Sequence, residues 1–364
     1  MSIGASSERI YNDVSVRGEE WLDKVCLNEK NCVEAFEFFV INNARENIHQ
    51  AVDGFLGLGR SEPFKSGKLA NVDFKRGPSY VDALYNEGLI SENTFSLFLS
   101  ANTANRYIHF GEPMTTSMNY PDKLMYIKLE DDLFWSTRCQ GFAFGPLLND
   151  YKVPNLETEY IKNGHIYSIF DSSSATIQIP DAIFDDFLDA LNIEAGKTYK
   201  QTYEENVGMY VPCGLAYPDL HFLFDRTWLQ VLPSDYVKDV SDTQDGSQCL
   251  MLITRGQDLP FLVMGLPLFV GYYTVHDDTK SRLGFVPHLG SAKKGPYFAA
   301  SNPSVDLRDA VERTDYDDLE SHPSKKGAEK SEKEEEEEEY TDTEVFLFWL
   351  SVTLAFCCCF FLFN

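Results

Sequence analysis

An aspartate at the end of an apolar run is the residue whose setting most suggests chemistry. Residues 166–180 read "IYSIFDSSSATIQIP", so Asp171 follows an apolar stretch, and three serines come next before β-favouring residues resume. A carboxylate held at the end of a buried strand can act as a general acid or base. Taken alone, an aspartate followed by serines is more often a turn residue. A catalytic interpretation of Asp171 therefore requires a partner group elsewhere in the chain.

Other catalytic and metal-binding patterns are missing from the sequence. None of the seven histidines is spaced to pair with a nucleophile, and no G-x-S-x-G motif indicates a serine hydrolase. There is no C-x-x-C pair and no cysteine–histidine spacing of the zinc kind. We therefore expect no metal site.

The eight cysteines fall into two groups. Three form a run at residues 357–359 in an apolar tail, where they serve as apolar filler or as sites of palmitoylation. The other five are Cys26, Cys32, Cys139, Cys213 and Cys249, so at least one of them is free or pairs between chains. Cys26 and Cys32 could close the short loop "CLNEKNC".

The charge balance excludes two classes of partner. The formal net charge is −26, and residues 305–344 alone carry 17 acidic and 6 basic residues, a net of −11. Nucleic acids and anionic membrane surfaces are bound through basic patches, and no Lys/Arg cluster offers one. We therefore expect no nucleic-acid partner.

The elements that must position Asp171 are mostly strands. Short alternating or apolar runs recur through residues 1–300, separated by Gly, Pro, Asn and Asp, which is typical of a β-rich chain. Two segments have helical spacing instead: "SYVDALYNEGLI" at 79–90, which we expect to end near Gly88, and "PDAIFDDFLDALNI" at 180–193. The second keeps four apolar residues on one face: Ile183, Phe184, Phe187 and Leu191.

The C-terminal region differs from the body. Residues 301–344 are polar and include "EKEEEEEEY", so we expect an acidic disordered linker. Residues 345–363 are uncharged over 19 positions, close to the roughly 20 that a membrane-spanning helix needs. A buried core helix and a cleaved lipid-anchor signal are the alternatives. "MSIGASSERIYNDV" at the other end has no apolar signal-peptide core.

The order of the motifs along the chain carries a resemblance. The segments are "VDGFLGLG" (52–59), "ISENTFSLFLS" (90–100), "YIHFGE" (107–112), "IFDSSSATIQIP" (169–180) and "FLVMGLPLFVGYYTVHDDTKSRLGFVP" (261–287). Their order resembles that of the pepsin-like aspartic proteases, and the match runs over residues 3–289. Members of that family carry D-G-[IV]-[LM]-G-L, then a helix, then a second D-[ST]-G loop, a disulfide and a C-terminal segment similar to 261–287.

The resemblance implies a mechanism for the aspartate that needs no metal or cofactor. Two aspartates, one from each lobe, share a proton and activate one water, because two carboxylates that close cannot both ionise. Asp171 then corresponds to the second-lobe aspartate, and Ser172 to the Ser/Thr beside it. Ser174 occupies a position where a hydroxyl often supports the loop. Cys213 and Cys249 correspond to the family's second-lobe disulfide, and the substrate is a peptide or protein.

The chain departs from the family pattern in two places. The loop reads D-S-S, so Ser173 adds a Cβ where the family has glycine, which could strain or displace the loop. No D-[ST]-G occurs anywhere, so the first aspartate and the flap would lie before Met1. Asp53–Gly54 is expected to be a structural turn, and Gly265 to permit close packing of a strand end.

We therefore expect an all-β, bilobal pepsin-like fold with the first lobe truncated, plus a C-terminal transmembrane helix. The expected divisions are a remnant of the N-terminal lobe at 1–112, the C-terminal lobe at 113–300, the linker at 301–344 and the transmembrane segment at 345–363.

Two functions fit these features. The first is a membrane-anchored aspartic endopeptidase, with its body lumenal or extracellular, whose first catalytic aspartate is absent from this chain. The alternative is a catalytically inactive pepsin-like binding or surface protein. A dimer that supplies one aspartate per chain needs two equivalent small lobes. This chain has one whole lobe and part of another, so we expect a monomer.

Overall fold

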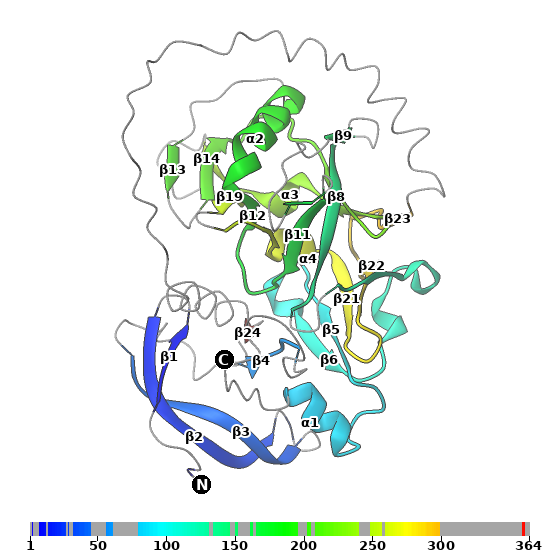
Figure 1. The fold of residues 1–364 in the computed structure, drawn as a ribbon. Coiled ribbons are helices and arrows are strands. Elements are labelled where there is room, and N and C mark those ends of the chain that lie inside the picture. Colours follow the sequence, from blue (N-terminus) through cyan, green and yellow to red (C-terminus); the bar gives the residue numbers. More distant parts are fainter. Residues whose placement is uncertain are drawn as a thin grey trace.

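β-Sheet is the main structure of the residues described, as the sequence predicts (Figure 1). The computed structural model describes residues 2, 7–11, 14–26, 28, 32–44, 56–60, 79–130, 134–145, 150–151, 161–162, 165–195, 202–204, 208–239, 248–256, 259–298 and 359–360. The Asp53–Gly54 turn and the linker at 301–344 lie outside these residues.

The largest sheet has ten strands and carries the Asp171 loop. Its main path runs in the order β19-β12-β20-β11-β8-β15-β16-β23, with β10 pairing with β11 and β9 with β8. The strands are β8 (Ser136–Phe144), β9 (Asp150–Tyr151), β10 (Ile161–Lys162), β11 (His165–Phe170), β12 (Ile177–Pro180), β15 (Leu220–Phe224), β16 (Thr227–Val231), β19 (Ile253–Gly256), β20 (Leu262–Met264) and β23 (Tyr297–Phe298).

A five-stranded sheet joins segments that are far apart in sequence. Its order is β6-β5-β21-β22-β7, all antiparallel, and Figure 1 shows the cyan β5 and β6 beside the yellow β21 and β22. The strands are β5 (Thr94–Phe98), β6 (Tyr107–Phe110), β7 (Met125–Lys128), β21 (Tyr272–Asp277) and β22 (Arg282–Pro287). This sheet therefore contains strands from both sides of the predicted 112/113 division.

Three smaller sheets complete the β-structure. The first, β1-β2-β3, is closed by a disulfide between Cys26 and Cys32, as the short spacing suggested. The others are β13-β14-β18-β17 and the pair β24-β4. The strands are β1 (Ser7–Tyr11), β2 (Val14–Cys26), β3 (Cys32–Ala44), β4 (Leu56–Gly57), β13 (Thr202–Glu204), β14 (Gly208–Pro212), β17 (Val237–Asp239), β18 (Gln248–Met251) and β24 (Cys359–Phe360).

Both predicted helices are present. α1 (Tyr80–Asn86) begins with a capping box in which Ser79 and Asp82 bond each other's backbone N–H, and Gly88 takes the left-handed φ of 71° just after it ends. α2 (Asp181–Ala195) starts directly after Pro180. It buries its predicted apolar face, because all four of its expected core residues are 3% exposed or less. Two single-turn helices, α3 (Pro233–Tyr236) and α4 (Leu266–Phe269), flank the sheets.

One apolar core connects the two large sheets. Leu97 and Ile127 from the five-stranded sheet pack in the same cluster as Phe142 and Phe170 from the ten-stranded sheet. Phe170 and Phe285 form a direct ring contact, with centroids 5.8 Å apart. The strand that ends at Asp171 is therefore anchored by packing from both sheets.

The predicted transmembrane segment at 345–363 lies outside the described residues, apart from Cys359–Phe360 in β24. Across the part of the chain that the structure describes, no helix has the length and apolar character needed to cross a membrane.

Candidate active site

Asp171 lies immediately beyond the C-terminal end of β11, where its backbone is fixed from two sides. The N–H of Phe170 donates to the carbonyl of Trp135 at 2.8 Å, and the N–H of Asp171 donates to the carbonyl of Met264 at 3.0 Å. Only 3% of Asp171 is exposed. The carboxyl group is therefore carried by a rigid strand end within the molecule.

The loop after Asp171 crosses over a neighbouring strand. β20 runs parallel to β11 and antiparallel to β12, and it lies between them in the sheet. Residues 171–176 connect the two outer strands, so this loop must pass the end of β20. That end is Met264, whose carbonyl accepts the Asp171 N–H.

Gly265 allows the loop to approach the end of β20. A Cβ built on Gly265 would lie 2.0 Å from the carbonyl oxygen of Thr176 and 2.7 Å from that of Ser174. The N–H of Leu266 donates to the same Ser174 carbonyl at 2.7 Å. The expected role of Gly265 in close packing is confirmed. Gly265 packs against the backbone of the loop that follows Asp171.

The three serines have different roles in the loop. Ser173 donates twice to one carboxyl oxygen of Asp171, Oδ1: from its backbone N–H at 2.9 Å and from Oγ at 2.6 Å. Ser174 Oγ instead donates to the carbonyl of Thr176 at 2.9 Å. Ser172 is half-buried and makes no recorded side-chain hydrogen bond among the described residues.

Ser173 stands at a position where the family has glycine, but its backbone does not take the positive φ that is strained for other residues. Among the described residues, the non-glycine residues with positive φ are Asp225, Arg226 and Ser281. Ser173 is not one of them, so its Cβ needs no left-handed conformation. The hydroxyl added by the departure from D-[ST]-G contacts the carboxyl group directly.

Burial dominates the electrostatics of Asp171. Desolvation raises the pKa of its carboxyl group above the ordinary value of 3.8, and the hydrogen bonds from Ser173 and Ser174 lower it by a smaller amount. None of these causes is a charged side chain among the described residues. The described residues therefore supply no second carboxylate beside Asp171, and the group keeps its proton to higher pH than a free aspartate.

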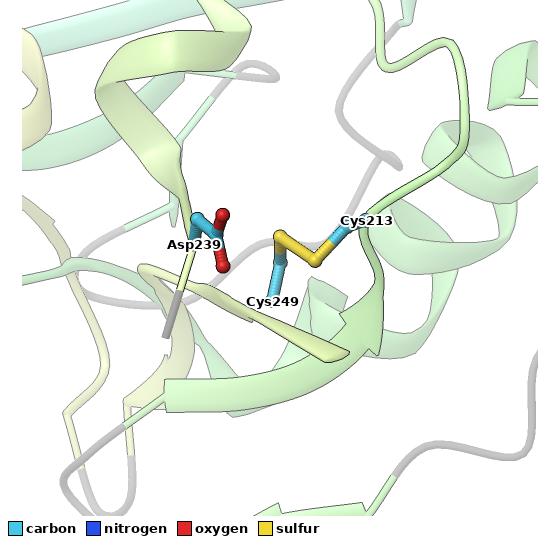
Figure 2. A group of neighbouring side chains, drawn as sticks. All are labelled: Cys213, Asp239 and Cys249. Atoms are coloured by element: carbon cyan, nitrogen blue, oxygen red, sulfur yellow. A yellow bond between two sulfur atoms is a disulfide. The ribbon is translucent and has the colours of Figure 1, made fainter. Parts of the chain in front are cut away.

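The remaining predicted cysteine pair is also bonded. Cys213, directly after β14, and Cys249, in β18, form a disulfide. Figure 2 shows this bond with the Asp239 carboxylate beside it. The three groups lie within 4.8 Å of one another, but both sulfurs are used by the disulfide, so this trio offers no thiolate ligand to a metal. Cys139 is free and buried, and burial raises the pKa of its thiol to about 12.

Two groups of contacts have no signal in the sequence. The first consists of the backbone carbonyls of Trp135 and Met264, which hold the aspartate strand. The second is a buried ion pair between Lys293 and Asp235, 3.3 Å apart, in which Lys293 also donates to the carbonyl of Leu268. Burial lowers the pKa of Lys293 to about 8 despite the attraction of Asp235. Every residue carries a backbone carbonyl, so no residue type marks the two that hold the strand. Lys293 lies in "SAKKGP" (291–296), which has the composition of an ordinary polar turn.

Comparison with known proteins agrees with the motif order. A family model described as eukaryotic aspartyl protease matches residues 3–288. A search of curated proteins found no match.

Proposed function

Because the chain belongs to the eukaryotic aspartyl protease family, we propose that Asp171 is one of the two aspartates of a pepsin-like endopeptidase site. Family membership supports aspartic-type proteolysis and a peptide or protein substrate. The observation that carries the assignment to Asp171 is its buried carboxyl group, which is 3% exposed at a strand end and held by two donors from Ser173.

The proposed reaction needs a second carboxyl group. One carboxylate takes a proton from water while the water oxygen bonds to the scissile carbonyl carbon, and the partner carboxyl gives its proton to the carbonyl oxygen. A gem-diol forms with no net change in protons. We propose that the partner aspartate and the flap are absent from this sequence. The lack of any D-[ST]-G in the sequence supports this.

Anchoring and location are part of the same proposal. The uncharged stretch at 345–363 and the acidic stretch at 301–344 before it support a single-pass C-terminal anchor on a disordered linker. The two disulfides support a lumenal or extracellular body. The remnant lobe at 1–112 and the complete lobe at 113–300 remain the proposed division, as one monomer.

The second candidate is a catalytically inactive pepsin-like binding or surface protein. It is favoured by the D-S-S loop and by the lack of a second carboxylate beside Asp171 among the described residues.

Peptide cleavage between pH 3 and pH 7 separates the two candidates. The protein, expressed from its native transcript, is assayed with a quenched-fluorescence peptide library. We expect cleavage that is fastest at acidic pH, blocked by a statine-type inhibitor and abolished in Asp171→Asn. The exposed helix residue Asp186 gives a matched control, and Asp186→Asn should cleave like the wild type. Peptide binding that survives Asp171→Asn, without cleavage at any pH, would favour the inactive candidate.

A further inference from the structure

The two hydrogen bonds from Ser173 to Asp171 differ in origin. A bond from the backbone N–H two residues on is an ordinary Asx turn, which any residue at this position could supply. The bond from Oγ, at 2.6 Å, depends on the serine side chain. Its length lies in the range for a hydroxyl donating to an ionised carboxylate. The family motif has glycine here and cannot supply it.

Neither neighbouring serine is placed to replace this hydroxyl. Ser174 Oγ donates to the Thr176 carbonyl and accepts a long hydrogen bond of 3.5 Å from the Gln178 side chain. The Ser174 hydroxyl thus stabilises the end of the loop that leads into β12. Ser172 makes no recorded side-chain hydrogen bond among the described residues. The hydroxyl that acts on the carboxyl group is the one at position 173.

Both donors from Ser173 converge on the same oxygen, Oδ1, and the backbone of Ser174 adds a further hydrogen bond to the carboxyl group. A carboxyl oxygen that accepts two hydrogen bonds is stabilised as an acceptor, so a proton is better placed on the other oxygen. We propose that Ser173 is a positioning residue that holds Oδ1 of Asp171 as an acceptor and thereby assigns the exchange of the catalytic proton to Oδ2. This inference rests on the proposed function of Asp171.

The inference predicts a direction for the pKa of Asp171. Burial raises this pKa and the Ser173 hydrogen bonds oppose the rise. The surrounding elements are β11, the end of β20, the start of α4 and the loop to β12, and none of their described residues places a charged group that shifts Asp171. Removing the Ser173 hydroxyl should therefore raise the pKa further.

Two variants of Ser173 test the role of the hydroxyl. Ser173→Ala keeps the Cβ and the N–H but removes Oγ, and Ser173→Thr keeps a hydroxyl. In the full protein, Ser173→Ala should lower kcat about tenfold or more with little change in KM, because the lost bond is charge-assisted and contacts the carboxyl group rather than substrate. Its pH–rate profile should move to higher pH. Ser173→Thr should restore both, and the exposed Ser234→Ala is the matched control.

A readout without proteolysis isolates the hydrogen bond. The difference in thermal stability between the wild type and Asp171→Asn, followed against pH, reports the pKa of Asp171 in the folded protein. The pH range over which this difference develops should extend higher in a Ser173→Ala background, and not in a Ser173→Thr background.

The outcomes separate the two proposals. If Asp171→Asn abolishes cleavage but Ser173→Ala changes neither the pH–rate profile nor the stability range, the inference fails and the proposed function stands. If the protein does not cleave, or cleaves equally well as Asp171→Asn, the proposed function fails, and the role of Ser173 in catalysis fails with it.

Discussion

At the scale of single residues, the proposed role of Asp171 depends on its burial and on the hydroxyl of Ser173 beside it. Asp171 is 3% exposed, and its Oδ1 accepts hydrogen bonds from the backbone N–H and the hydroxyl of Ser173. Burial of an ionisable group is costly unless it is neutral or well bonded. Burial raises the pKa of Asp171, and the hydrogen bonds from Ser173 and Ser174 offset only part of this rise.

This balance predicts how stability depends on pH. Folded Asp171 binds its proton more tightly than in the unfolded chain, so the free energy of unfolding falls as pH rises from the ordinary pKa of 3.8 to the raised folded value. Asp171→Asn removes the ionisable group, so its free energy of unfolding should not fall for this reason as pH rises. Its melting temperature should exceed that of the wild type at pH 7, by about 2–4 °C for each kcal/mol recovered.

The check is a thermal unfolding series by circular dichroism from pH 3 to pH 7. The advantage of Asp171→Asn should shrink as pH falls toward the ordinary carboxyl pKa, and Asp186→Asn should show no such trend. A constant offset at every pH would mean that the carboxyl group does not titrate abnormally.

At the scale of elements, the loop depends on the strand that it crosses. β20 lies between β11 and β12, and its end is reached by the loop backbone at Ser174 and Thr176. Backbone groups pack against backbone groups here, which leaves no space for a side chain at Gly265. The position of the carboxyl group is therefore set by strand order as much as by the D-S-S residues.

Gly265→Ala should therefore destabilise the protein. The new Cβ would lie 2.0 Å from the Thr176 carbonyl oxygen, so the loop must move and its bond from Leu266 would be lost. Overpacking of this kind costs about 1–3 kcal/mol. Urea denaturation measures the change, and Gly214→Ala, where a Cβ meets nothing within 4 Å, is the matched control. Equal stability of the two variants would count against tight packing behind the loop.

At the scale of the whole molecule, the five-stranded sheet joins the two parts that the sequence divides at 112. β5 and β6 precede this division, whereas β7, β21 and β22 follow it. Every residue of β21 is buried, and β5 covers one of its edges. Each part therefore depends on the other for its hydrogen bonding and its core.

Truncation tests this dependence. A fragment of residues 113–300 lacks β5, so the edge of β21 from Tyr273 to Asp277 loses its partner and is open to intermolecular pairing. We expect this fragment to aggregate on refolding, and a fragment of residues 79–300, which keeps α1, β5 and β6, to remain more soluble. Size-exclusion chromatography distinguishes them. If the 113–300 fragment is monomeric and melts at the same temperature as the 79–300 fragment, then β5 and β6 are not needed for the stability of this part.

Properties that depend on local pattern could be predicted from the sequence. Alternating apolar residues predicted the strands, helical spacing with Ser79 and Pro180 at the starts predicted α1 and α2, and motif order indicated the family. The short spacing of Cys26 and Cys32 suggested their disulfide, and the family resemblance implied the one between Cys213 and Cys249. The sequence around Gly265 suggested close packing of a strand end.

The contacts at the site, in contrast, depend on the tertiary fold. It placed the hydroxyl of Ser173, rather than that of Ser174, on the carboxyl group, and it brought Met264 to the Asp171 backbone across some ninety positions of sequence. It also paired Lys293 with Asp235 in the interior. The physical reason is that such contacts depend on strand order and on backbone carbonyls, which every residue carries and no side-chain pattern specifies.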